Sequence, residues 1–190
     1  MVQRTSQAVI MAELDSPVGV LVAGVTDEGV CLLEFRDREI LDAQVARIGD
    51  RVGPVKTGRH TFLDQLRSQL EEYFDARRRE FTLPLVYPGS PFQKKVWNAL
   101  RAIPYGETIS YEELARRIGS PAAQRAVGHA NGQNPLAIII PCHRVINKGG
   151  KLGGYGGGLW RKALLLDLER AQEPDLFTTK RAMSNAHAMR

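Results

Sequence analysis

The sequence predicts an α+β protein in which a strand-rich part, residues 1–88, precedes a helical part, residues 89–172. Apolar runs separated by turn residues fill the first 35 positions, which is typical of strands. Segments with helical spacing and marked starts follow Pro88. The length of 190 residues is sufficient for one large domain or two small ones.

The first part contains three predicted strands, a helix and a candidate fourth strand. Turn residues separate apolar runs at 8–14, 18–25 and 30–35. Residues 61–76 place large apolar side chains along one helical face, and arginines 77–79 follow where the helix dipole favours cations. Residues 81–86 are a candidate further strand, and the Tyr-Pro-Gly sequence at 87–89 ends this part of the chain.

The second part contains helices with clear starts. Ser90 and Gln93 form a predicted capping box with a proline between them, so a helix is expected from there to about residue 102. Ser110 begins a second capping box, and Gly119 ends that helix. A short turn then leads to a third helix at about 122–132. Helix, short turn and helix are the arrangement of a helix-turn-helix unit.

The third helix is predicted to expose an unusual face. Its small apolar residues Ala122, Ala123, Ala126, Val127 and Ala130 share one side, which leaves Gln124, Arg125, Gly128 and Asn131 on or near the other. Small groups around one long cation allow close approach of the backbone, as a minor groove about 6 Å wide requires. Glycines that merely weaken a surface helix are the alternative explanation.

Charge and cysteine content restrict the partners and the compartment. Residues 1–93 carry 11 basic and 14 acidic side chains, a net of −3, whereas residues 94–162 carry 11 and 3, a net of +8. The basic block indicates a polyanionic partner, with a solvated basic surface as the alternative. Cys31 and Cys142 have neither disulfide nor zinc-site spacing, and no membrane span or signal segment is visible. We expect a protein of the reducing cytoplasm.

The most reactive candidate is Cys142, in the sequence Ile140-Pro141-Cys142-His143-Arg144-Val145. A free thiol titrates near ~8.5, and neighbouring positive charge or a positioned base raises its thiolate fraction. The imidazole and the guanidinium that follow the cysteine therefore favour a functional thiol. A buried core cysteine, which the apolar environment of Cys31 predicts for that residue, is the alternative at position 142.

Four segments together resemble the O6-alkylguanine-DNA alkyltransferases, also called methylated-DNA–protein-cysteine methyltransferases. They are Arg125-Ala126-Val127-Gly128, Asn134-Pro135, the Cys142 segment and Gly154-Tyr155-Gly156-Gly157-Gly158, and the match extends from about residue 90 to 169. The resemblance implies a ribonuclease-H-like first domain and a winged-helix-like second domain. It also implies irreversible, single-turnover transfer of an alkyl group from O6-alkylguanine in double-stranded DNA to Cys142, with O4-alkylthymine as a further candidate substrate. A monomer without a cofactor is expected. No metal is expected either, because the cysteines of the family's occasional zinc site are absent.

The resemblance assigns a role to each matched residue. Cys142 is the expected nucleophile, His143 takes the thiol proton through a water, and Glu169 orients the imidazole. Tyr111 donates to a ring nitrogen of the departing guanine, and Asn134 holds the turn around the site. Arg125 enters the duplex where the alkylated nucleotide has been flipped out, as chemistry on a stacked base requires. Val145, Tyr155 and Gly156 are expected at the base pocket, although many family members carry serine at the position of Gly156.

Three other functions remain as alternatives from the sequence. A helix-turn-helix regulator would use the same DNA-binding unit, and a non-repairing lesion-recognition protein would replace the cysteine. A cysteine hydrolase would bring cysteine and histidine together from distant positions, whereas adjacent side chains diverge. Residues 173–190 show no evident fold and are expected to be a mobile tail.

Overall fold

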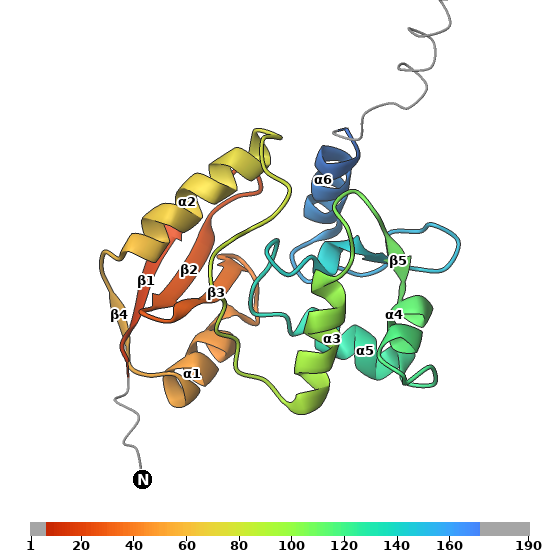
Figure 1. Ribbon diagram of the computed structural model, residues 1–190, viewed down its shortest axis with the longest axis horizontal. Coiled ribbons are helices and arrows are strands. Elements are labelled where there is room, and N and C mark those ends of the chain that lie inside the picture. The colour runs from red at the N-terminus through yellow and green to blue at the C-terminus, as the bar shows by residue number, and fades with distance from the viewer. Residues whose placement is uncertain (1–6, 172–190) are drawn as a thin grey trace, which may run out of the picture.

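The computed structural model of the protein describes residues 7–171. A four-stranded sheet with two helices comes from the first half of the chain, and shorter strands with four helices come from the second half (Figure 1). The predicted α+β fold class is therefore confirmed. Among the described residues, no helix is long and apolar enough to cross a membrane.

The main sheet has the strand order β3-β2-β1-β4. Strands β1 (Val9–Leu14), β2 (Leu21–Thr26) and β3 (Gly29–Phe35) form an antiparallel meander, and β4 (Val55–Thr57) pairs with β1 in parallel. Every residue of β2 and β3 is buried. Continuous apolar runs produce this pattern because helices cover both faces of the two strands.

The two N-terminal helices pack on opposite faces of the sheet (Figure 1). Helix α2 (Thr61–Phe74) contacts β2 through its leucines and Tyr73, and the ring of His60 caps its start by accepting from the backbone N–H of Phe62 at 3.1 Å. Helix α1 (Leu41–Arg51) covers the other face with Leu41 and Ile48. Helix α1 and strand β4 are absent from the sequence-based prediction.

The C-terminal part has the predicted helices. Helix α3 (Pro91–Arg101) begins with the predicted capping box between Ser90 and Gln93, and Ser110 caps α4 (Tyr111–Arg117). A short turn then leads to α5 (Gln124–Gly132), and α6 (Leu159–Arg170) is the last helix of the described residues. The small strands β5 (Ile109–Ser110) and β6 (Val145–Ile146) pair in parallel between these helices.

Several predicted boundaries differ from the structure. The third C-terminal helix starts at Gln124 instead of 122, and α2 ends at Phe74 instead of 76. Residues 81–86 form no strand, since only Leu85 makes a bridge, to Val30. The chain there crosses from one part to the other and leaves the sheet after that single contact. The predicted mobile tail, 173–190, lies outside the described residues.

The edge strand β3 joins the two parts of the protein. The backbone N–H of Leu33 donates to the carbonyl oxygen of Pro135 at 2.9 Å, and the N–H of Ala137 donates to that of Leu33 at 2.7 Å. This pairing covers an edge that would otherwise expose unpaired backbone groups. One hydrophobic cluster continues across the junction. The segment that leads to Cys142 is thus fixed against the N-terminal sheet.

Candidate active site

Cys142 lies at the junction of the two parts, in a cavity of about 180 Å³. It starts a single 3-10 turn, Cys142–Arg144, and its side chain is buried. Helix α5, the first residue of α4 and the glycine-rich loop before α6 supply the other walls. The lining residues are Arg38, Tyr111, Gly128, Asn131, Gly132, Cys142, Gly154, Tyr155 and Gly156.

Asn134 holds the chain that leads to the cysteine. Its amide nitrogen donates to the carbonyl oxygens of Ile140 at 2.8 Å and Leu136 at 3.3 Å, and its Oδ1 accepts from the N–H of Leu136 at 3.0 Å. Within this turn Ile138 has a φ of 69°, a backbone conformation that residues other than glycine rarely adopt. The buried amide thus stabilises a strained turn just before Cys142.

A buried polar network surrounds Glu169 of α6, which is 0% exposed. Its Oε1 lies 2.8 Å from Nε2 of His143 and accepts from the hydroxyl of Tyr73 at 2.8 Å. Arg144 donates to both carboxylate oxygens, through Nε at 2.8 Å and Nη2 at 3.0 Å. The backbone N–H of Gly106 completes the set at 3.2 Å. One carboxylate therefore joins α2, α6 and the 3-10 turn.

The network favours an ionised Glu169 beside a neutral His143. Burial by itself raises the pKa of Glu169, but hydrogen bonds and charge from His143 and Arg144 outweigh it and hold the pKa far below its ordinary value of 4.5. Burial lowers the pKa of His143 below 6.5, although Glu169 opposes this shift. Nδ1 of His143 is buried and makes no hydrogen bond within residues 7–171. A neutral imidazole with Nε2–H bound to the carboxylate has Nδ1 available as an acceptor.

Burial, and not the charge of its sequence neighbours, has the largest effect on the thiol of Cys142. Burial raises the pKa of Cys142 above its ordinary value of 9.0, and Glu34 adds to the rise, while Asn134, Arg38 and Tyr155 oppose it. The guanidinium of Arg144 binds Glu169 and the carbonyl oxygen of Ile103 instead of the sulfur. The sulfur therefore rests as a neutral thiol, and its reaction requires a base.

Two tyrosines face the cavity near the sulfur. Tyr111, the first residue of α4, packs on α5, since a Cβ atom at Gly128 would lie 3.8 Å from its ring. Burial is the main cause that raises the pKa of Tyr111 and raises the pKa of Tyr155 well above 10.0, and the thiolate form of Cys142 would raise both further. Both phenols are therefore protonated and able to donate at neutral pH.

Val145, whose carbonyl oxygen the resemblance implied at the base pocket, is not among the residues that line the cavity. It starts β6 opposite Ile109, so its side chain is buried in the core. Its carbonyl oxygen accepts from the ammonium group of Lys162 at 2.6 Å. Lys162 also donates to the carbonyl oxygens of Leu152 at 2.5 Å and Gly154 at 3.3 Å, and thereby fixes the glycine-rich loop. Burial lowers the pKa of Lys162 to about 8.

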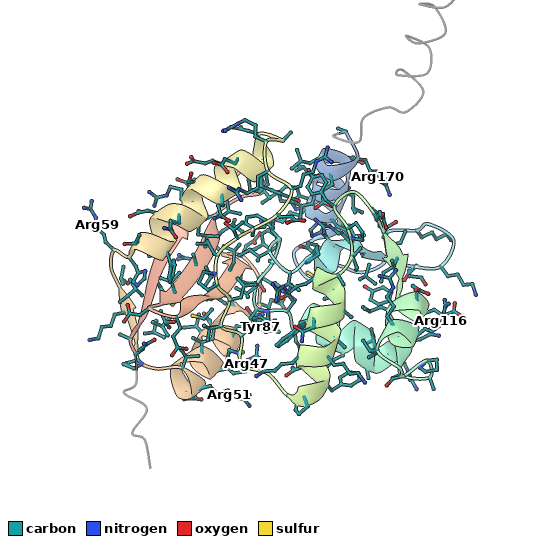
Figure 2. The ribbon with its side chains drawn as sticks, in the orientation of Figure 1. Arg47, Arg51, Arg59, Tyr87, Arg116 and Arg170 are labelled. Carbon is teal, nitrogen blue, oxygen red and sulfur yellow. The ribbon has the colours of Figure 1, made fainter. Side chains whose placement is uncertain are left out.

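Helix α5 exposes part of the face that its helical pattern predicts. Gln124 and Arg125 are exposed as expected, but Asn131 is only 6% exposed and lines the cavity. Ala122 and Ala126, predicted on the buried face, are exposed. The helix rests on α3 through its C-terminal half, where the indole N–H of Trp97 donates to the carbonyl oxygen of Ala130 at 2.9 Å. Figure 2 shows Arg116 pointing outward from neighbouring α4.

Sequence reasoning missed several residues of the site. Arg38 and Tyr73 come from the N-terminal part and reach the site only through the packing of the two parts. Lys162 was counted as one charge of the basic block, yet it is 0% exposed. No group of acidic, histidine or cysteine side chains suited to a metal ion occurs in residues 7–171. Cys31 and Cys142 are both free and buried.

Comparison with known proteins agrees with this geometry. Residues 9–87 match the ribonuclease-like domain of 6-O-methylguanine DNA methyltransferase, and residues 91–171 match the DNA binding domain of that protein. A methylated-DNA–protein-cysteine methyltransferase of Mycolicibacterium paratuberculosis is 46% identical over 165 residues, which cover 87% of this chain and 94% of the relative.

Solved structures show the same relationship. The O6-methylguanine methyltransferase of Mycobacterium tuberculosis is 41% identical with a TM-score of 0.75, covering 90% of this chain and 98% of that one. The Mycobacterium tuberculosis OGT in complex with DNA is 40% identical with a TM-score of 0.73, covering 88% and 96%. The chain therefore belongs to the 6-O-methylguanine DNA methyltransferase family.

Proposed function

We propose that this protein repairs O6-alkylguanine in double-stranded DNA by moving the alkyl group to Sγ of Cys142. The observation that carries the proposal is the position of Cys142: the sulfur shares a cavity with helix α5, and the next residue, His143, is hydrogen-bonded to a buried carboxylate. Membership of the methyltransferase family supports the same reaction. A regulator or a lesion-binding protein that does not repair requires no cysteine with a proton acceptor beside it.

The reaction is a displacement at the alkyl carbon. Sγ of Cys142 forms a bond to that carbon while the bond from carbon to guanine O6 breaks. The thiol proton passes through a water to Nδ1 of His143, whose opposite nitrogen is fixed by Glu169 at 2.8 Å. The hydroxyl of Tyr111 gives its proton to a ring nitrogen of the departing guanine, which therefore leaves as the neutral base. The imidazolium of His143 then releases its proton to water and Tyr111 takes one up, so that the thiol proton ends on guanine in the net reaction. The net products are an S-alkylcysteine and guanine.

The product accounts for a single turnover. A thioether carbon has no readily displaced leaving group, and no second thiol is among the described residues that line the cavity. Water therefore does not regenerate the thiol. The protein is consumed as it repairs, and no cofactor takes part in the step.

DNA binding requires the target nucleotide to leave the base stack, because the alkylated oxygen is inaccessible inside a duplex. The exposed start of α5, with Gln124 and Arg125, is suited to the minor groove. Arg125 takes the place of the flipped nucleotide, and Gly128 and Asn131 face the base in the cavity. The net charge of +8 over residues 94–162 attracts the phosphate backbone.

The cytoplasm is the proposed compartment, because both cysteines are free and a reactive thiol needs reducing conditions.

The direct test is peptide mapping by mass spectrometry after incubation with a duplex that contains O6-methylguanine. We expect the methyl group on the peptide that carries Cys142 and none in Cys142→Ser. Cys31→Ser is the matched control, since Cys31 is also free and buried but lies in β3. Binding of the duplex without methyl transfer would instead support a lesion-recognition protein or a regulator.

A further inference from the structure

Arg38 carries a positive charge from the N-terminal sheet into the cavity of Cys142. It lies in the turn between β3 and α1, and its side chain is 13% exposed. Of the residues that line the cavity within the described chain, Arg38 alone comes from the strand-rich part. The N-terminal domain thus forms part of the surface that the substrate meets.

The guanidinium of Arg38 is held from two sides. Nη1 donates to Oε2 of Glu34 at 2.5 Å, and Nη2 donates to the carbonyl oxygen of Gly132, the last residue of α5. Glu34 is 0% exposed, and its other oxygen accepts from the N–H of Phe35 at 2.9 Å. A buried carboxylate requires such partners, and a helix C-terminus attracts a cation. Arg38 therefore has a fixed position.

Gly156 of the glycine-rich loop lies directly against this guanidinium. A Cβ atom at position 156 would lie 2.3 Å from Nη2 and 2.5 Å from Cζ of Arg38. Gly153 and Gly158 have positive φ angles, but Gly156 does not, so its backbone conformation is open to any residue. The absence of a side chain at position 156 is needed for contact with Arg38.

The same turn supports the next residue of the loop. A Cβ atom at Gly157 would lie 2.5 Å from the ring of Phe35. Arg161 of α6 donates to both carboxylate oxygens of Asp37 at 2.9 Å and to the carbonyl oxygen of Gly157 at 2.9 Å. The loop over Cys142 therefore rests on residues 35–38.

We propose that Arg38 is a specificity-determining residue, whose fixed guanidinium supports the loop at Gly156 and limits the size of the alkyl group that fits beside Cys142. The proposal rests on the alkyl-transfer function proposed above. The cavity of about 180 Å³ is smaller than the ~300–1,000 Å³ of pockets for drug-sized ligands. A methyl group fits with little displacement, whereas an aromatic group must lift the loop from Arg38.

The test compares single-turnover rates on duplexes that contain O6-methylguanine or O6-benzylguanine. Glu34→Gln and Arg38→Ala are combined, so that no buried carboxylate is left unpaired. We expect the ratio of the benzyl rate to the methyl rate to rise about tenfold or more, the scale of discrimination by pocket size. Arg59→Ala, an exposed arginine far from the cavity (Figure 2), leaves the ratio unchanged. An unchanged ratio in the folded double variant would overturn the proposal.

A second measurement does not depend on activity. Gly156→Ala is introduced into the wild type and into the Glu34→Gln/Arg38→Ala background, and the thermal midpoint of each protein is measured. We expect a clear decrease in the wild-type background and little change in the double variant, because the clashing guanidinium is gone. Equal decreases would refute the contact. If the wild type transfers no methyl group, the proposed function fails, while this comparison still decides whether Arg38 supports the loop.

Discussion

At Glu169, hydrogen bonds arrive from residues that are far apart in the sequence. Tyr73 lies on α2, Gly106 precedes β5, and His143 and Arg144 form the 3-10 turn. In the proposed mechanism the ionised carboxylate orients the imidazole for proton transfer, and it also balances the buried charge of Arg144. Function and stability therefore depend on the same side chain.

Glu169→Gln tests both roles. Because the folded-state pKa of Glu169 is lowered, its contribution to stability is complete above the ordinary carboxyl value of 4.5 and is lost as the pH falls. Loss of the charge leaves Arg144 unpaired, which costs about 3–5 kcal/mol at pH 7. Urea unfolding should show this deficit at pH 7 and a smaller one below pH 4.5. Glu113→Gln, which breaks the surface ion pairs with Arg116 and Arg117, should change stability little. An equal deficit at all pH values would contradict the ionised state.

The pH dependence of alkyl transfer tests the proposed base. The pKa of His143 lies below 6.5, so the rate should be constant from pH 8 to 6.5 and decline only in more acidic solution. His143→Ala should lower the rate by about 10²–10⁴ at neutral pH, with much less effect on DNA binding. Quenched single-turnover reactions measure both. A rate that rises steadily toward the ordinary thiol pKa of 9.0 would indicate that a free thiolate reacts without a base.

At the scale of elements, local signals in the sequence predicted some features and not others. Ser90 and Ser110 mark the starts of α3 and α4, because an N-cap is a local hydrogen bond. The predicted capping box forms at Ser90, whereas Ser110 accepts from the N–H of Glu113 without the reciprocal bond. Helix α1 escaped prediction because Ile40 at its start provides no cap, and β4 because its three residues are exposed. Ala122 and Ala126 were expected on the buried face but are exposed, since packing on α3, and not the spacing of alanines, sets the orientation of α5. The roles of Cys142 and His143 came from the family resemblance. The spacing of residues does not show that His143 contacts Glu169, because the contact forms only when α6 packs beside the 3-10 turn.

Arg125 tests the role of α5. It is exposed near the start of the helix, and we propose that it inserts into the duplex and stabilises the vacated position of the flipped nucleotide. Arg125→Ala should therefore slow repair of a paired O6-methylguanine more than reaction with free O6-benzylguanine, which needs no flipping. Arg59→Ala serves as the control for the loss of one positive charge. Equal losses on duplex and free base would leave Arg125 as an ordinary residue of the pocket.

At the scale of the whole molecule, the two domains differ in charge and in what they contribute to the site. The N-terminal residues 1–93 have a net charge of −3, while residues 94–162 have +8 and hold α5 and Cys142. The strand-rich domain contributes Arg38 to the cavity and covers the segment before Cys142 through the edge of β3. It thereby shapes the site, whereas the helical domain attracts DNA.

The salt dependence of DNA binding should distinguish the attraction of DNA by the basic block from the reaction in the cavity. Because counterions are released on binding, the logarithm of the DNA-binding constant falls linearly with the logarithm of the salt concentration. The slope is about −0.9 for each phosphate contacted. Binding of both methylated and unmodified duplex should weaken in parallel between low and moderate salt, as fluorescence anisotropy measures. Reaction with a free alkylated base, which carries no phosphate, should be nearly unaffected over the same range. A salt-independent affinity for duplex would contradict the role of the basic block.

The central claim is that Cys142 is consumed as it repairs. Intact-mass spectrometry with O6-methylguanine duplex in excess over protein measures this directly, because each transfer adds one methyl group. The account predicts that methyl transfer stops at one group for each protein molecule, that the group is on Cys142, and that the released duplex contains guanine. Continued repair beyond one equivalent, or guanine formation with Cys142 unmodified, would contradict it.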